Sequence, residues 1–165
     1  MTNVLFEFAD PNAAAAWHAI DGRVMGGVSR STLRHDPAAH AVFEGTVCLA
    51  HDGGFASVRS DPGDRGLAGA GSCLIEVRGD TRTFKLGLMT DDGFDSVNDQ
   101  ASLTPVGIDR QTLQLPLAHF RASFRGRDVI GAPALDPACI RQVGLMIAAR
   151  EAGPFALHIR RISLA

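Results

Sequence analysis

Apolar and polar residues alternate along most of this chain with the two-residue period of β-strands. Apolar residues occupy every second position over 43–49, 73–77, 84–88, 113–117 and 155–159. Pro116 predicts that its strand lies at a sheet edge or is about to end, because proline cannot donate to a ladder. The nearly continuous apolar run over 144–148 instead predicts a central strand. The dominant pattern is therefore that of a half-buried sheet.

Turn signals separate these rows, and helical signals are few. Asp-Pro, Asp-Gly and Gly-Pro pairs interrupt the alternation. Asp10-Pro11 predicts one or two helical turns over 12–20, and Asp136-Pro137 resembles a second helix start. About eight or nine short strands with so few helices indicate a sandwich or a barrel. We expect one all-β domain over residues 1–165.

Composition narrows the class of partner. The net charge is −2 and the pI is about 6.3, which gives no basic face for nucleic acid. No apolar run approaches the roughly 20 residues of a membrane-spanning helix, so membrane insertion is not expected. The amino terminus lacks a signal or transit pattern, and the 3 cysteines form no CxxC pair. These features predict reduced thiols and a cytoplasmic protein. Positive charge that is nearly all arginine indicates a GC-rich bacterial coding bias.

Several motifs in one order carry a family resemblance. They are DGRVMGGVSRS (21–31), DGGFASVRS (52–60), VRGDTR (77–82) and tail segments at 115–120, 124–127, 143–146 and 153–157. From about Phe6 to Ile162 the chain resembles the complex I intermediate-associated protein 30 family, assembly factors of NADH:ubiquinone oxidoreductase. The resemblance implies a galactose-binding-like jelly-roll β-sandwich, an architecture shared with carbohydrate-binding modules. It also implies a chaperone-like role in complex I assembly, as for eukaryotic relatives, and no established catalytic activity.

Some positions depart from the family pattern. Asp52 stands where the family usually has asparagine, and Thr81 replaces a glycine. A tryptophan usual near 109–112 is missing, Phe84 replaces a common tyrosine, and the chain has no tyrosine at all. These changes weaken the transfer of any ligand specificity that depends on aromatic stacking.

The double glycine Gly26-Gly27 is the most distinctive candidate for a binding loop. Glycine lets the backbone approach a ligand closely, so this loop could present its amides together with Asp21, Ser29 and Ser31. The alternative is a bulged strand entry, in which the two glycines let neighbouring apolar side chains pack beneath. The sequence leaves both interpretations open.

A second candidate is formed by arginines on strand faces. Arg59 could form bidentate hydrogen bonds with a carboxylate or polar ligand. Alternatively, it could form a structural ion pair with Asp80 or Asp21. Arg78, Asp80 and Arg82 occupy alternate positions, so they would share a face if their strand continued through 79. With Arg59 they would then line one polar patch; the alternative is a solvated strand end.

Metal and nucleophile patterns are weak. Asp91, Asp92, Asp95 and Asp99 form an oxygen-rich loop that suits calcium, but Val97 occupies a position where an EF-hand needs oxygen. A solvated acidic loop is the alternative. The 6 histidines show no zinc spacing, and no GxSxG, GxGxxG or Walker pattern occurs.

These observations favour a non-catalytic binding or scaffold domain that engages a partner protein through an arginine and aspartate face. By the resemblance, the partner would be a complex I subunit or assembly intermediate. Two alternatives remain: a carbohydrate-binding module, which usually needs an aromatic platform, and an enzyme whose acid–base groups the sequence does not reveal.

Overall fold

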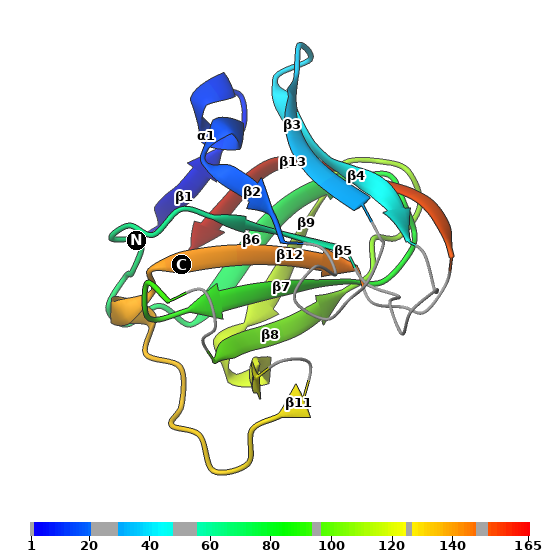
Figure 1. Cartoon of the computed structure of the whole chain (residues 1–165). Helices are drawn as coiled ribbons and strands as arrows, with labels where there is room; N and C mark the ends of the chain where they lie inside the picture. The colour runs from blue at the N-terminus through cyan, green and yellow to red at the C-terminus, as the bar shows by residue number, and fades with distance from the viewer. Residues whose placement is uncertain (1, 21–29, 48–55, 94–96, 125–126, 148–151) are drawn as a thin grey trace.

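A computed structural model describes the chain except for a few short segments. These are residues 1, 21–29, 48–55, 94–96, 125–126 and 148–151. Over the described residues the chain forms two antiparallel sheets with their apolar faces packed together (Figure 1). The all-β sandwich predicted from the alternation is confirmed.

Sheet A has six strands in the order β3-β4-β13-β6-β9, with β1 pairing to the far half of β13. Its strands are β1 (Asn3–Glu7), β3 (Arg30–Asp36), β4 (His40–Val47), β6 (Ser72–Arg78), β9 (Gln111–Pro116) and β13 (Gly153–Leu164). The edge position predicted for the strand with Pro116 is confirmed, since β9 ends the order.

Sheet B has seven strands in the order β11-β10-β8-β7-β12-β5-β2. They are β2 (Trp17–Ala19), β5 (Ala56–Ser60), β7 (Phe84–Met89), β8 (Asn98–Leu103), β10 (Arg121–Phe124), β11 (Arg127–Asp128) and β12 (Gln142–Ile147). The apolar run at 144–148 lies in β12 up to Ile147, and β12 is central, as predicted.

Among the described residues, helical structure comprises α1 (Pro11–Ala15) and the 3-10 turns η3 (Leu117–His119) and η4 (Pro137–Cys139). Both predicted starts are confirmed: Asp10 caps α1 by accepting from Asn12 N–H, and Asp136 caps η4. The predicted extension of the first helix to residue 20 is wrong. Residues 17–19 form β2 instead, because Trp17 faces the core beside β5.

The core between the sheets is aromatic and aliphatic. Phe43, Phe84 and Phe155 meet edge to face with ring centroids 5.0 to 6.1 Å apart. Phe6 and Trp17 form a second such contact at 5.0 Å. Since these rings fill the space between the sheets, they are withdrawn from the outer faces where a ligand could stack on them.

Candidate functional site

The centre of the outer face of sheet B brings together polar residues from four strands. Register places Arg59 of β5 opposite Gly144 of β12, then Gly87 of β7, then Gln100 of β8. Directly paired residues of antiparallel strands point to the same face. Arg59 lies between Val58 and Ser60, both buried, so its side chain points outward. Because Gly144 and Gly87 have no side chains, the surface between Arg59 and Gln100 is recessed.

A second outward row runs beside the first. Ser57 of β5 pairs with Met146 of β12, which pairs with Lys85 of β7. Lys85, the only lysine of the chain, is half-buried at the centre of the sheet. We call the surface between the two rows the Arg59–Lys85 hollow; the residues that line it are Ile20, Ser57, Val58, Arg59, Lys85, Gly87, Asn98, Gln100, Gly144, Leu145 and Met146.

The chemistry of the Arg59–Lys85 hollow is cationic and narrow. Its described lining contains an arginine and a lysine but no carboxylate. Its volume is about 20 Å³, which admits one water-sized group. Asn98 lies folded over Gly87, where a Cβ would overlap its side-chain amide, and Asn98 Oδ1 is buried without a hydrogen bond. Such a hollow suits a single anionic oxygen-bearing group, such as the tip of a carboxylate side chain.

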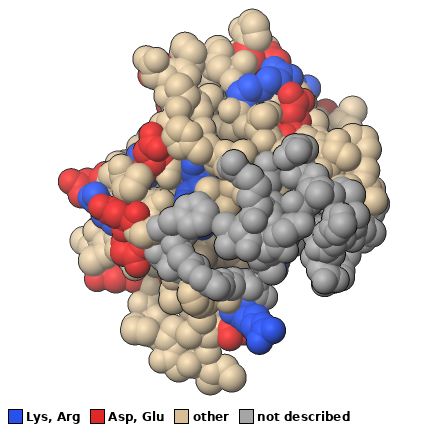
Figure 2. Space-filling view, in the orientation of Figure 1, with Lys and Arg blue, Asp and Glu red and all other residues tan. Residues whose placement is uncertain are grey.

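Figure 2 shows the molecule from the side of sheet B. Other charged groups gather toward the periphery of this view, where red and blue atoms are interspersed. Arg141, for example, pairs with Asp92 at 2.7 Å and also with Asp64. Peripheral pairs of this kind neutralise each other.

Four of the residues predicted from the double-glycine motif lie outside the described part of the chain: Asp21, Gly26, Gly27 and Ser29. Their proposed role stays a prediction. Ser31 is described and buried in β3, and its hydroxyl donates to the carbonyl of Ser57 across the two sheets at 3.2 Å. Ser31 therefore fastens β3 to β5 rather than facing solvent.

Arg78 lies on the outer face of sheet A, opposite His158 in the register of β6 and β13. Its Nη2 approaches His158 Nδ1 at 3.5 Å, and His40 Nε2 lies 2.8 Å from the same nitrogen. Arginine has no acceptor, so His158 Nδ1 must accept and His40 must carry its proton on Nε2. Burial lowers the pKa of both histidines, and the Arg78 charge lowers them further. The arrangement holds the two rings neutral.

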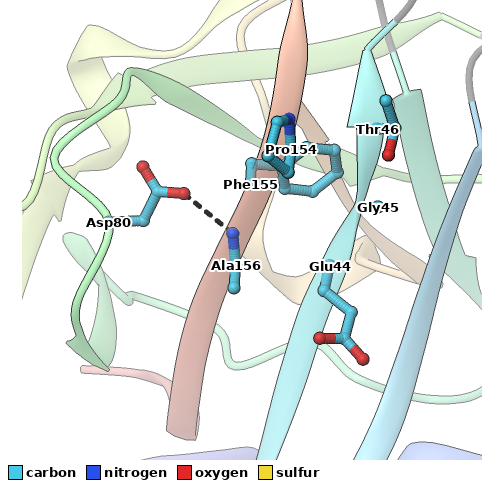
Figure 3. Close-up of a pocket in the computed structure, with 7 residues that line it drawn as sticks. All are labelled: Glu44, Gly45, Thr46, Asp80, Pro154, Phe155 and Ala156. Carbon is cyan, nitrogen blue, oxygen red and sulfur yellow. Dashed lines mark hydrogen bonds between the residues drawn. The ribbon is translucent and has the colours of Figure 1, made fainter.

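Asp80 makes its contacts within the fold. The shared face of Arg78, Asp80 and Arg82 required the strand to continue through Gly79. Strand β6 instead ends at Arg78, because Gly79 and Asp80 adopt positive φ angles of 72° and 50°. The chain turns away, and Asp80 Oδ2 then accepts from Ala156 N–H at 2.8 Å (Figure 3). The open depression beside it, about 580 Å³, holds a second carboxylate in Glu44, which Arg34 already engages.

Arg82 also contacts the start of β13. Its Nη1 donates to the carbonyl of Pro154 at 3.2 Å and to that of Gly153 at 3.5 Å. Its own backbone N–H donates to Asp80 Oδ1. The segment between β6 and β7 is thus attached to the start of β13 by both side chains, which explains why polar residues occupy these positions.

The single polar patch expected from the arginines is therefore not formed. Arg59 points outward from sheet B, whereas Arg78 points outward from sheet A, on the opposite side of the sandwich. The alternation was interpreted correctly within each strand, but it cannot say which sheet a strand joins. The internal ion pair suggested between Arg59 and Asp80 is excluded by the same separation.

Sequence reasoning missed Lys85 and Gln100. The signal for Lys85 was available, since Phe84, Leu86 and Leu88 were assigned to the core and Lys85 alternates with them. It is also the only lysine in the sequence. No local signal could place it beside Arg59, because β5 and β7 become neighbours only through β12.

The described aspartates of the acidic loop make different contacts and do not converge on one site. Asp91 Oδ1 accepts from Gly93 N–H, Asp92 pairs with Arg141, and Asp99 belongs to β8. Asp95 lies outside the described residues. Among described side chains, no three of the metal-binding types gather in one place. Within the described ranges, no helix has the length and hydropathy to cross a bilayer.

Comparison with known proteins identifies the family. A family model described as "Complex I intermediate-associated protein 30" matches residues 6–159. The chain belongs to the complex I intermediate-associated protein 30 family. It is 28% identical over 187 residues to the mitochondrial protein of that name from Drosophila melanogaster, covering 99% of this chain and 62% of the fly protein. An uncharacterized protein of Schizosaccharomyces pombe is 29% identical over 153 residues, covering 79% of this chain and 70% of its own length.

Solved structures show which fold this family member shares. The family 11 carbohydrate-binding module of Clostridium thermocellum, in complex with a mixed-linked tetrasaccharide, superposes with a TM-score of 0.72. Sequence identity is 17%, with 99% of this chain and 94% of the module covered. A family 29 carbohydrate-binding module superposes with a TM-score of 0.54. Its sequence identity is 12%, with 100% of this chain and 91% of the module covered. The galactose-binding-like sandwich expected from the resemblance is confirmed, and likeness at this identity concerns the fold alone.

Proposed function

We propose that this domain is a non-catalytic scaffold in complex I assembly and that it captures a partner protein at the Arg59–Lys85 hollow. The observation that supports the proposal is a pair of cationic side chains on a glycine floor, with no carboxylate in the described lining. A partner would insert an acidic side chain there and form charge-assisted hydrogen bonds with both cations. Polar side chains around the hollow would fix its orientation.

The family supports the assembly role. The Drosophila relative is named for a complex I intermediate, and this chain covers 62% of it. The partner we propose is accordingly a complex I subunit or an assembly intermediate, met in the cytoplasm. A protein partner also suits this site, since interfaces commonly centre on a few desolvated charged or aromatic residues.

The size of the hollow argues for a side chain rather than a sugar. About 20 Å³ is far below the roughly 300 Å³ or more of typical small-molecule sites. The aromatic residues that a sugar would stack on are mostly in the core over the described chain, with Trp17 only 6% exposed. Carbohydrate binding, which the shared fold suggests, is therefore the alternative that an experiment should test.

Genetic complementation tests the proposal. Deleting the gene should reduce mature complex I and accumulate an intermediate on native gels, and the wild-type gene should restore assembly. Lys85→Glu should fail to restore it, because the substitution places a negative charge where the partner's carboxylate inserts. Arg110→Glu makes the same charge change on an exposed residue distant from the hollow and should restore assembly.

Two results would overturn the proposal. One is full complementation by Lys85→Glu at normal protein levels. The other is normal complex I in the deletion strain.

Purified domain should also show no saturable binding in isothermal titration with mixed-linked β-glucan oligosaccharides. Binding that Lys85→Glu removes would move the function to carbohydrate recognition.

A further inference from the structure

A separate pocket lies on the inner side of sheet B, beneath the segment that joins β11 to η4. Figure 1 shows this segment swinging out from the sheets before it returns at η4. It is attached at both ends: Val129 N–H donates to the carbonyl of Ala122 at 3.0 Å, and Leu67 N–H donates to that of Pro137 at 2.8 Å. The open pocket between these attachments has a volume of about 370 Å³. That volume falls within the range of small-ligand sites.

Most of the residues that line this pocket have apolar side chains or none. Phe120 and Ala122 supply the side next to β10, and Val129, Pro133 and Leu135 supply the outer segment. Arg121 and Asp128 also line it, one from β10 and one from β11. Its remaining charged lining residue is Asp99, which comes from β8. A concave site lined mainly by apolar residues, with a few charged groups, is a usual form of binding site for a small organic molecule.

Asp99 occupies an inward position that the strand pattern reserves for an apolar side chain. It pairs with Leu88 on one side and Ala122 on the other, and it shares the inner face with Ala101 and Leu103. Leu88 is fully buried, so the carboxyl of Asp99 points to the inner side of the sheet. It is partly buried there.

Among the residues that the structure describes, the carboxyl has no partner that would explain its position. Burial raises its pKa above the ordinary 3.8, and no neighbouring charge contributes to the shift. No described residue donates a hydrogen bond to it. A desolvated carboxyl without a cation costs stability, and such groups concentrate where a ligand supplies the missing partner.

We propose that this pocket binds a small apolar ligand that carries an ammonium group, with Asp99 as its counter-ion. An ionised carboxylate is an acceptor only, so it selects a donor, and a cationic donor also compensates for its desolvation. Phe120 and Leu135 bury the apolar part of the ligand. The site lies on the inner side of β8 and is independent of the Arg59–Lys85 hollow, so either can fail without the other.

Titration of the isotope-labelled domain with benzylammonium chloride, followed by amide NMR, tests the site. Saturable shifts should map to Asp99, Ala122 and Leu135, and Asp99→Asn should weaken binding by about tenfold or more, as expected for loss of a charge-assisted contact. Benzyl alcohol, the neutral analogue, should bind weakly and equally to both proteins. Asp109→Asn makes the same charge change at a distant exposed residue and should bind benzylammonium like the wild type.

The variants also separate binding from folding. Asp99→Asn should retain the wild-type fold because Asp99 makes no ion pair with a described residue. Ala132→Phe should block the pocket sterically without a charge change. The proposal is wrong if Asp99→Asn keeps its preference for benzylammonium over benzyl alcohol. It is equally wrong if the shifts map to other acidic residues or if none appear up to the solubility limit of the salt.

Discussion

Asp80 Oδ2 accepts a hydrogen bond from the backbone N–H of Ala156 at a distance of 2.8 Å. Strand β6 pairs with β13 from His158 onward but ends at Arg78, so the ladder has no backbone acceptor for Ala156 on that side. The Asp80 side chain takes the place of the missing carbonyl. An acidic residue that resembled a binding group in the sequence thus completes a sheet.

Asp80→Ala should lower the free energy of unfolding by about 1–3 kcal/mol, because it leaves the partly buried backbone N–H of Ala156 without its acceptor. Alanine is also strained at the φ of +50° that Asp80 adopts. Asp80→Asn keeps an oxygen acceptor and tolerates this backbone conformation, so it should lose less. Urea unfolding followed by circular dichroism measures both, with Asp109→Ala as an exposed control. Equal stability of all three would show that the bond contributes nothing.

The neutral histidine pair should make the protein acid-sensitive. The pKa values of His40 and His158 are lowered from 6.5 in the folded state, so the unfolded chain binds more protons as the pH falls below 6.5. Stability should be fully present above about pH 6.5 and should fall progressively below it, until the pH passes the folded-state values. Urea unfolding at a series of pH values measures this slope.

His158→Gln should flatten that slope, since glutamine keeps a hydrogen-bonding side chain but cannot titrate. The surrounding charges act in both directions: Asp36 raises the pKa of both rings, whereas Arg78 lowers both, Arg110 lowers that of His40 and Arg34 that of His158. A slope between pH 5 and 7 unchanged in His158→Gln would assign the acid sensitivity to other groups.

Lys85→Met should leave stability unchanged or slightly higher. Lys85 is half-buried and makes no ion pair with a described residue, and methionine has a similar length without the charge. Thermal unfolding measures the change, with Leu86→Ala as a destabilising comparison because Leu86 is fully buried. A loss of about 2 kcal/mol or more on removing Lys85 would mark it as a structural residue.

Cys73 should be inert to alkylation in the native protein. It is fully buried, and burial raises the pKa of its thiol to about 12. Cys139 is exposed, although its contact with Asp136 raises its pKa, so iodoacetamide should label it first. Peptide mapping by mass spectrometry before and after denaturation tests the order. Native labelling of Cys73 at the rate of Cys139 would contradict the burial.

Local patterns were enough to predict much of the architecture. The alternation over 84–88 and 155–159 placed the core rings Phe84 and Phe155 correctly, and Pro116 marked an edge strand. Asp-Pro pairs located both helix starts. The candidate site was harder to predict, because Arg59 and Arg78 each point outward as expected but from opposite sheets.

By itself the sequence determined the class of fold, the outward or inward direction of side chains within the strands that it predicted, and the family. Those properties depend on the two-residue period and on motifs within a few residues of one another. Only the tertiary structure decided that Lys85 joins Arg59 across β12, and that Asp80 binds the start of β13. Such neighbours depend on the order of strands in a sheet, which long-range pairing sets and no local pattern encodes.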